Sequence, residues 1–160
     1  MRYVMKQKMF AFGDDFAIKD ENGDDCYFVD GKVFTIGDKL LFQDMRGNEL
    51  ARIEQKVLSI GKAYRIIRDG RDMATVKKKI FTLFRDAFEV EDAALGDLDA
   101  QGDFFDWEYQ FTRDGRPIAT VSKRFFTWTD TYGVEIAEGE DAVLILACVV
   151  VIDLCSHDEE

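Results

Sequence analysis

An internal repeat constrains the fold of this chain more than any other feature of its sequence. Residues 64–76 and 109–121 are near copies of each other, and each has Arg-Asp-Gly-Arg at its centre. Asp-Gly is a favoured pair for the type I′ turn, in which both central residues need a positive φ, so each copy predicts a β-hairpin. A weaker copy covers residues 45–53, and residues 20–23 supply a further turn of the same kind. The chain is therefore expected to consist largely of short antiparallel strands.

The residues before and within the second copy alternate between apolar and polar. Phe105, Trp107, Tyr109 and Phe111 fall on one face of the expected strands, and polar residues separate them. A period of two is typical of a strand with one buried face. Together with the glycine turns of residues 1–136, this pattern predicts roughly ten to twelve short strands, at the spacing of a sandwich or barrel.

The C-terminal segment breaks this pattern. Residues 142–152 are apolar without interruption, and three acids among residues 138–141 precede them, where a helix N-terminus favours negative charge. A helix that is apolar on every side is buried in protein or in a membrane, and a spanning helix needs about 20 residues, so burial in protein is expected. The sequence therefore predicts a mainly β fold, a closed antiparallel β-barrel of about twelve strands around a central hydrophobic C-terminal α-helix. It predicts a single domain over residues 1–160, with the barrel strands in 1–136 and the central helix in 138–156.

Charge is segregated along the chain. The chain carries 32 acidic and 21 basic side chains, a net charge of −11, which is the wrong sign for a general nucleic-acid binder. Residues 52–85 nevertheless hold ten basic and three acidic residues, whereas residues 86–108 hold nine acids and no base. Residues 130–160 also hold nine acids and no base. The net charge therefore does not exclude an anionic partner, because such a partner would bind the local basic region only.

The basic region supplies the candidate binding residues. In the two-residue turn of the first copy, Arg68 lies opposite Arg71. Arg113 and Arg116 repeat this arrangement in the second copy, and like charges directly opposite destabilise a sheet. The aspartate within each turn, the acids of residues 86–108 or an external anion such as a phosphate headgroup would neutralise them, and solvated turns with internal salt bridges are the commoner outcome. The candidate anion-binding residues are Arg68, Arg71, Lys77, Lys78, Lys79, Arg113 and Arg116.

Catalysis and metal binding find little support. The chain has one histidine and three cysteines. Cys155 and His157 are two residues apart, so they do not face each other on a helix, and no third group is evident to orient them. The acidic residues 20–25 do not follow the EF-hand pattern of oxygen ligands, so a polar turn is expected there. We therefore expect no enzyme activity, no metal site and no cofactor.

Several other positions carry specific expectations. Asp153, the one charged residue in the apolar segment, is expected at the mouth of the barrel, where it is hydrogen-bonded or hydrated. His157 is expected to interact with the dipole at the helix C-terminus. Trp107 and Trp128 are expected in the core or on a sheet face. The longest loop is expected at Ala93–Gly102.

The N-terminal residues are not expected to form a secretion signal. Residues 1–8 mix apolar and charged side chains and contain no apolar signal-peptide core. Three cysteines, an odd number, do not form a disulfide framework, which favours a reducing compartment. The sequence therefore predicts a cytoplasmic protein that is not an integral membrane protein.

Several segments of the chain resemble one known family. Residues 16–23 read Phe-Ala-Ile-Lys-Asp-Glu-Asn-Gly, residues 27–34 read Tyr-Phe-Val-Asp-Gly-Lys-Val-Phe, and residues 128–136 read Trp-Thr-Asp-Thr-Tyr-Gly-Val-Glu-Ile. With residues 36–40, the repeated hairpins and the apolar helix followed by His-Asp, they resemble the LURP-one-related family over nearly the whole chain. The acidic stretch 86–108 is longer or more divergent than the family pattern.

The resemblance implies both a fold and a kind of function. The fold is similar to the Tubby C-terminal domain and the phospholipid scramblases, a twelve-stranded barrel around a C-terminal helix. The family has no established catalytic residues, Tubby domains bind phosphoinositides, and scramblases act on lipids. The resemblance therefore favours a non-catalytic barrel module that binds an anionic ligand, a phospholipid headgroup or membrane surface, or a protein partner. A scramblase-like lipid-handling factor is the alternative, and a nucleic-acid binder is the least favoured class.

Overall fold

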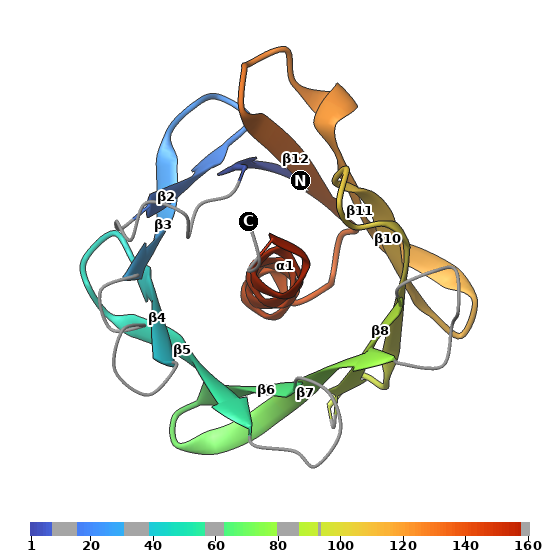
Figure 1. Cartoon of the computed structure of the whole chain (residues 1–160). Coiled ribbons are helices and arrows are strands. Elements are labelled where there is room, and N and C mark those ends of the chain that lie inside the picture. Colours follow the sequence, from blue (N-terminus) through green and yellow to red (C-terminus); the bar gives the residue numbers. More distant parts are fainter. Residues whose placement is uncertain (8–15, 31–38, 57–62, 80–86, 93, 158–160) are drawn as a thin grey trace.

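The chain folds into a barrel with a helix inside it (Figure 1). The computed structural model describes residues 1–7, 16–30, 39–56, 63–79, 87–92 and 94–157. Within these residues, twelve antiparallel strands each pair with their neighbours in sequence, and β12 pairs with β1 to close the barrel. The elements are β1 (Arg2–Lys6), β2 (Phe16–Asp20), β3 (Asp25–Asp30), β4 (Lys39–Asp44), β5 (Glu49–Lys56), β6 (Ala63–Arg68), β7 (Arg71–Lys79), β8 (Ala87–Asp92), β9 (Leu98–Asp103), β10 (Glu108–Arg113), β11 (Arg116–Ser122), the 3₁₀-helix η2 (Lys123–Phe125), β12 (Thr131–Ile136) and α1 (Ala142–His157). The predicted closed β-barrel around a hydrophobic C-terminal helix is confirmed.

Both Arg-Asp-Gly-Arg turns are tight hairpins. Asp69 and Asp114 have φ angles of 52° and 51°, and the glycines that follow, Gly70 and Gly115, have φ angles of 75° and 77°. Aspartate is among the few non-glycine residues that adopt this region readily. In each hairpin the two arginines are register partners, and the register shifts between the two residues that precede the first arginine. The two copies therefore share a β-bulge as well as a turn.

Helix α1 runs inside the barrel, surrounded by the strands (Figure 1). Every residue from Leu144 to Leu154 is buried, including the charged Asp153. Alternate residues of the strands point inward and pack in the same core, among them the fully buried Ile18, Phe42 and Ile66. Burying one large aliphatic side chain contributes roughly 1.5–3 kcal/mol. The barrel wall therefore accounts for a helix that is apolar on every side.

The antiparallel order gives the barrel two different ends. The tight turns at 21–24, 45–48, 69–70 and 114–115 lie at the end where α1 begins, which we name the start end. The turn between β9 and β10, the segment that contains η2 and the last turn of α1 lie at the opposite end, which we name the far end. Residues 137–141 cross the start end and lead into the helix.

Three predictions about the wall of the barrel are wrong. Ala93–Gly102 is not a long loop, because β9 occupies its second half and pairs with both β8 and β10. Residues 104–107 form a turn in which Trp107 has a φ of 52°, so Phe105 leaves the inward face and is 58% exposed, whereas Trp107 is buried. Trp128, which was expected in the core or on a sheet face, is 48% exposed.

Candidate functional site

The first repeat hairpin clamps the beginning of α1. The Arg68 guanidinium donates to both carboxylate oxygens of Asp141, from Nη1 at 3.0 Å and from Nη2 at 3.2 Å. Its Nε donates to the backbone oxygen of Leu50 on β5 at 3.3 Å. Asp141 also accepts a hydrogen bond from the backbone nitrogen of Leu144 at 3.2 Å, so it caps the helix N-terminus. A bidentate arginine–carboxylate pair is strong and directional, and this one ties the hairpin to the helix.

The second repeat hairpin makes the equivalent contact one residue earlier. Arg113 donates from Nη1 to Glu140 Oε1 at 2.7 Å and from Nε to the backbone oxygen of Gly96 at 3.5 Å. The Arg113 and Glu140 side chains are 16% and 14% exposed. Arg113 Nη2 and Glu140 Oε2 are buried and have no hydrogen-bond partner among the described residues. The first arginine of each repeat therefore holds the helix entry, through acids that were not among the neutralising partners expected from the sequence.

Neighbouring acidic strands pair with the lysines of the basic region. Strand β7 pairs with β8, and β8 pairs with β9. Lys77 Nζ lies 2.8 Å from Glu91 Oε1, and Lys79 Nζ lies 3.0 Å from Asp99 Oδ1. The hydrogen bond to Glu91 raises the pKa of Lys77 above its usual value. Lys78 is half-buried on the same strand. The acidic stretch, expected as a partner of the arginines, thus pairs with the lysines.

Two candidate cations stay exposed at the start end. Arg71 and Arg116 occupy the second arginine position of the two turns, and neither forms an ion pair with any residue that the structure describes. The backbone nitrogen of Ala137 donates to the oxygen of Ile118 at 2.9 Å. Residues 138–139 form a turn directly after this hydrogen bond.

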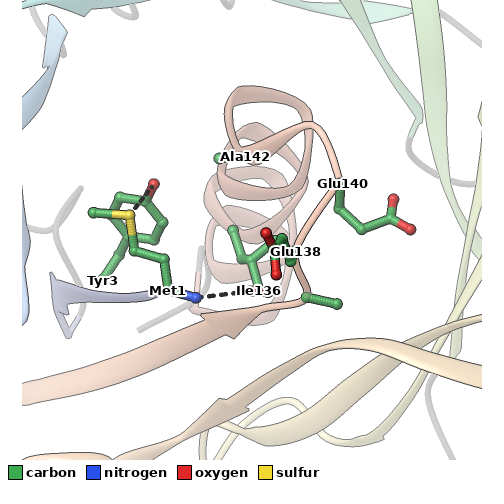
Figure 2. Close-up of a pocket in the computed structure, with 8 residues that line it drawn as sticks. Met1, Tyr3, Ile136, Glu138, Glu140 and Ala142 are labelled. Carbon is green, nitrogen blue, oxygen red and sulfur yellow. Dashed lines mark hydrogen bonds between the residues drawn. The ribbon is translucent and has the colours of Figure 1, made fainter.

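A cavity of about 400 Å³ lies at the start end next to this segment (Figure 2). The Met1 amino group donates to the backbone oxygen of Ile136 at 3.0 Å, and the Tyr3 hydroxyl donates to the Met1 sulfur at 3.3 Å. Burial, with a smaller contribution from Tyr27, raises the pKa of Tyr3 to about 12, so the phenol is neutral at physiological pH. No lining residue was a candidate, because the cavity depends on β1 and β12 meeting when the barrel closes. The lining residues are Met1, Tyr3, Ile136, Ala137, Glu138, Gly139, Glu140 and Ala142.

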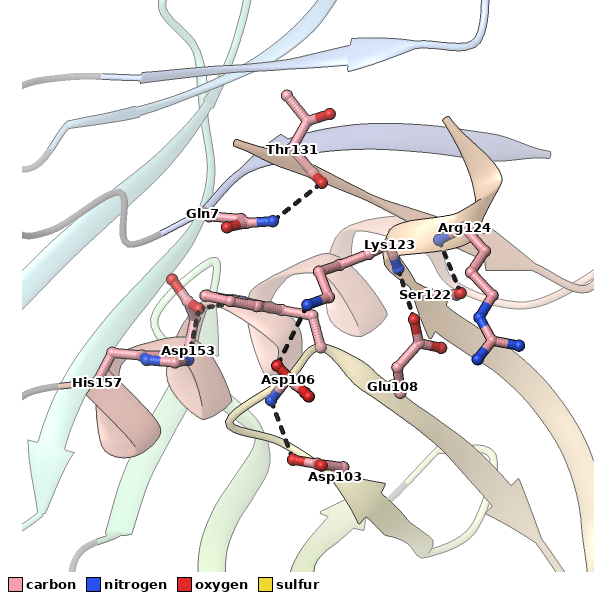
Figure 3. Close-up of polar contacts among 11 residues, drawn as sticks. Gln7, Asp103, Asp106, Glu108, Ser122, Lys123, Arg124, Thr131, Asp153 and His157 are labelled. Atoms are coloured by element: carbon pink, nitrogen blue, oxygen red, sulfur yellow. Dashed lines mark hydrogen bonds and ion pairs between the residues drawn. The ribbon is translucent and has the colours of Figure 1, made fainter. Parts of the chain in front are cut away.

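The far end holds Asp153 in a buried polar cluster (Figure 3). Trp107 Nε1 donates to Asp153 Oδ1 at 2.7 Å, which confirms the expected hydrogen bond of this carboxylate. The His157 ring stacks on Trp107, with centroids 4.4 Å apart and an angle of 10° between the planes. His157 Nε2 lies 3.8 Å from Asp153 Oδ1, at the i, i+4 spacing that a helix brings onto one face. That spacing is the sequence signal that would have identified the pair.

Two tyrosines share the surroundings of Asp153. Burial, followed by the Asp153 charge, raises the pKa of both Tyr109 and Tyr132 well above the usual value. The Tyr132 hydroxyl is buried and has no hydrogen-bond partner within the described part of the chain. The His157 side chain is 4% exposed and its ring stacks on Trp107, so the histidine–aspartate pair is buried. The cluster fastens the last turn of α1 to the wall.

The acidic turns of the start end use their carboxylates internally. Asp20 Oδ1 accepts hydrogen bonds from the backbone nitrogens of Asn22 and Asp24, at 2.9 and 3.0 Å, and Asp44 does the same in the next hairpin. The acidic residues 20–25 thus form the polar turn that was expected. In the described ranges, no group of three or more His, Cys, Asp and Glu side chains is arranged to hold a metal ion. No helix in these ranges combines the length and apolar character needed to cross a membrane.

Comparison with known proteins places the chain in a family. The model of the LURP-one-related family matches residues 1–153. The chain belongs to the LURP-one-related family. It is 33% identical over 156 residues to the uncharacterized protein YxjI of Bacillus subtilis (strain 168), an alignment that covers 98% of this chain and 94% of YxjI. A solved structure of an Arabidopsis thaliana protein has the same fold, with a TM-score of 0.70 at 16% identity over 95% of this chain and 88% of that one.

The two ends of this LURP-one-related barrel differ in what they offer a ligand. Within the residues that the structure describes at the far end, the Trp107 and His157 rings pack around Asp153. The start end has a cavity and exposed guanidinium groups, among them the two candidates Arg71 and Arg116. Arginine binds carboxylate and phosphate through paired N–H donors. The start end is therefore the candidate functional site.

Proposed function

We propose that this LURP-one-related protein is a non-catalytic barrel module that binds an anionic group of its ligand at the start end. The observation that carries the proposal is the pair Arg71 and Arg116, which are exposed at equivalent repeat positions and meet no acid among the described residues. The cavity at the same end of the barrel includes Met1, Ile136 and Ala142, which offer apolar surface for the rest of a small ligand. Arg68 and Arg113 leave the list of binding candidates, because they hold the helix entry.

The charges around the two arginines favour a compact anion over an extended anionic surface. Asp69 and Asp114 stand within the two turns, and Glu138 is exposed at the rim of the cavity. An anionic membrane surface would contact these carboxylates together with the arginines and would be repelled by them. A single phosphate or carboxylate group can contact one guanidinium alone. The family resemblance implies a likeness to the Tubby C-terminal domain and the phospholipid scramblases, which makes a phospholipid headgroup one proposed source of that anion. A soluble phosphate compound and a protein carboxylate are the others.

Two features support a non-catalytic role in the cytoplasm. The side chain of the one histidine of the chain is 4% exposed and stacks on Trp107. Cys26, Cys148 and Cys155 form no disulfide in the described structure, which fits a reducing compartment. A scramblase-like role would require α1 to leave a barrel in which eleven of its residues, Leu144–Leu154, are buried and both of its ends are fastened. The chain's net charge of −11 keeps a nucleic-acid binder the least favoured class.

The test compares Arg71→Ala and Arg116→Ala with a matched control. Arg52→Ala removes the same charge from the barrel wall, where Arg52 pairs with Glu49. The probes are inorganic phosphate, a soluble inositol phosphate, and phosphatidylcholine vesicles with and without phosphatidylserine. Losing one charge-assisted contact of 1.5–3 kcal/mol weakens binding about ten-fold or more, so Arg116→Ala is expected to do so while Arg52→Ala does not. Equal affinity of all three variants for every probe would reject the proposal.

A further inference from the structure

The chain contains two asparagines, and each lies in a tight turn at the start end. Asn22 lies between β2 and β3 and is followed by Gly23, whereas Asn48 lies between β4 and β5 and is followed by Glu49 (Figure 1). The backbone nitrogen of the residue after an asparagine can attack its side-chain amide. That nitrogen is least hindered in glycine, which has no Cβ. The two turns therefore allow a direct comparison of two asparagines in one protein.

The two turns share the same backbone hydrogen bonds. Asp20 Oδ1 accepts from the backbone nitrogens two and four residues later, at 2.9 and 3.0 Å, and Asp44 Oδ1 does the same at 2.9 Å in both cases. Gly23 and Gly47 each donate to the backbone oxygen of these aspartates at 3.1 Å, with φ angles of 87° and 85°. The turns thus differ in where the asparagine stands and in what holds its side chain.

The carboxamide of Asn22 is open to reaction. Asn22 is exposed, and its side chain makes no hydrogen bond with a residue that the structure describes. A Cβ atom on Gly23 would meet nothing within 4 Å, so the space beside this backbone is free. The Gly23 nitrogen is held by its hydrogen bond to the Asp20 oxygen, at 3.1 Å in a turn that water reaches. Because glycine adopts many backbone conformations, this nitrogen can turn toward the neighbouring amide once that bond opens.

The carboxamide of Asn48 is held in place instead. Its Nδ2 donates to Asp44 Oδ2 at 2.9 Å, and this hydrogen bond is the main cause that lowers the pKa of the Asp44 carboxyl below its usual value. A hydrogen bond to an ionised carboxylate is stronger than one between neutral groups. The following residue, Glu49, begins β5 and is in register with Gln43. Both reacting groups at Asn48 are therefore restrained.

We propose that Asn22–Gly23 is a site of spontaneous covalent modification, at which the Asn22 amide is converted to a carboxylate. The Gly23 nitrogen loses its proton to the solvent and bonds to the Asn22 side-chain carbonyl carbon. The bond from that carbon to the amide nitrogen breaks, and the nitrogen leaves as ammonia after it takes up a proton. Water then adds to either carbonyl of the resulting five-membered imide and opens the ring, which gives aspartate or isoaspartate. Water is the one co-reactant, and nothing is oxidised or reduced.

Both products change the turn. Each adds a negative charge next to Glu21 and Asp24, which are exposed. Isoaspartate also adds one carbon to the backbone between the two nitrogens that Asp20 Oδ1 accepts from, so the spacing that gives the 2.9 and 3.0 Å hydrogen bonds is lost. The turn contains neither Arg71 nor Arg116 and lines no part of the cavity, so the inference goes beyond the proposed function and does not depend on it.

The experiment follows both asparagines in one sample. The full chain is incubated in mildly alkaline buffer, digested with trypsin at intervals and measured by liquid chromatography and mass spectrometry. Trypsin cuts after Lys and Arg, and peptides 20–32 and 47–52 each contain a single side-chain amide, that of Asn22 or Asn48. We expect peptide 20–32 to gain the mass of the amide-to-acid change in two new peaks. We expect Asn48 to convert about ten-fold more slowly or less, because its hydrogen bond to Asp44 must first break.

The controls separate the folded turn from the bare sequence. A sample digested before incubation gives the background, and Asn22→Gln, whose imide ring would have six members, is expected to keep its amide. Conversion of Asn22 in urea but not in the folded chain would overturn the inference, because the turn would then protect the site. Equal rates at Asn22 and Asn48 in the folded chain would overturn it as well. Arg116→Ala is expected to convert Asn22 at the native rate, so failure here and failure of the start-end proposal are separate results.

Discussion

The two ends of α1 are fastened to the same barrel by different chemistry. At the start end, the Arg68–Asp141 and Arg113–Glu140 pairs hold the helix through side chains that are between 14% and 33% exposed. At the far end, the buried Asp153 carboxylate accepts from Trp107, and His157 stacks on that indole. When a partly exposed ion pair is broken, water hydrates the separated charges and lowers the cost. Water does not reach a buried carboxylate in the same way, so the loss of its hydrogen-bond donor costs more. The far end therefore anchors the helix, and the start end is the place where side chains can serve a ligand at small cost in stability.

The largest effect is expected when the anchor at the far end is weakened. Trp107→Phe keeps an aromatic ring against His157 but removes the N–H that donates to Asp153 at 2.7 Å. Leaving a buried carboxylate without this donor is expected to lower the free energy of unfolding by about 3 kcal/mol, measured by urea denaturation. Trp128→Phe is the control, because its indole nitrogen makes no hydrogen bond with a described residue, and it is expected to change stability by less than about 0.5 kcal/mol. Equal effects would show that the far end is not the anchor.

The second effect uses pH to test the same buried cluster. Burial and the Asp153 charge raise the folded-state pKa of Tyr132, so folding favours the neutral phenol. That contribution is complete below the unfolded pKa of about 10 and is lost as the pH rises above it, by about 1.4 kcal/mol per pH unit. Tyr132→Phe is expected to unfold at a higher pH than the native chain. At pH 7 it is expected to be equally or slightly more stable, because the hydroxyl has no hydrogen-bond partner in the described structure.

Urea denaturation at pH 7 and at two alkaline pH values measures the difference. Trp128→Phe is expected to lose stability with pH as the native chain does, since it leaves the buried phenols in place. Identical alkaline losses in Tyr132→Phe and the native chain would contradict the idea that the far end is closed to water.

The third effect is expected at the start end and compares the two repeats. Arg113→Ala leaves the Glu140 carboxylate, which is 14% exposed, without its cation, and is expected to cost about 1.5 kcal/mol. Arg68→Ala breaks a more exposed pair and is expected to cost about 1 kcal/mol. Arg71→Ala, in the same turn as Arg68, is the matched control with an effect below about 0.5 kcal/mol, because it breaks no ion pair in the described chain. If Arg71→Ala were as damaging as Arg113→Ala, the division of the repeat into a structural and an exposed arginine would be wrong.

The sequence predicted the parts of this fold that depend on neighbours along the chain. The Arg-Asp-Gly-Arg turns follow from residues in direct succession, so their positive φ angles and the opposition of Arg68 and Arg71 were predictable. The buried helix was also predictable, because its sequence has no polar face that would lie against water. The need of Asp153 for a hydrogen bond was predictable from its surroundings, although its donor, Trp107, lies 46 residues away in the sequence.

The parts that the sequence did not predict depend on distant contacts. Asp141 lies 73 residues from Arg68, and only barrel closure brings the two together. Strand β9 was missed because its sequence, Leu-Asp-Ala-Gln-Gly-Asp, lacks β-branched and aromatic residues. Its neighbours fix it: Lys79 pairs with Asp99, and a Cβ on Gly102 would lie 2.5 Å from the Glu108 backbone oxygen. The exposure of Trp128 follows from its place in residues 123–130, the connection between β11 and β12, which has no strand periodicity that would predict it.

The smallest effect is expected on the barrel wall between the two ends. Lys77 and Glu91 are 36% and 48% exposed, so their 2.8 Å ion pair competes with water on both sides. A double-mutant cycle of Lys77→Ala and Glu91→Ala is expected to give a coupling below about 0.5 kcal/mol that vanishes in about 1 M salt, where the Debye length falls to about 3 Å. The Arg113–Glu140 pair is the comparison, because it is less exposed and its coupling is expected to survive that salt. A coupling on the wall that exceeds the coupling at Arg113 would mean that the charged strands β7, β8 and β9, and not the ends of α1, carry the polar contribution to stability.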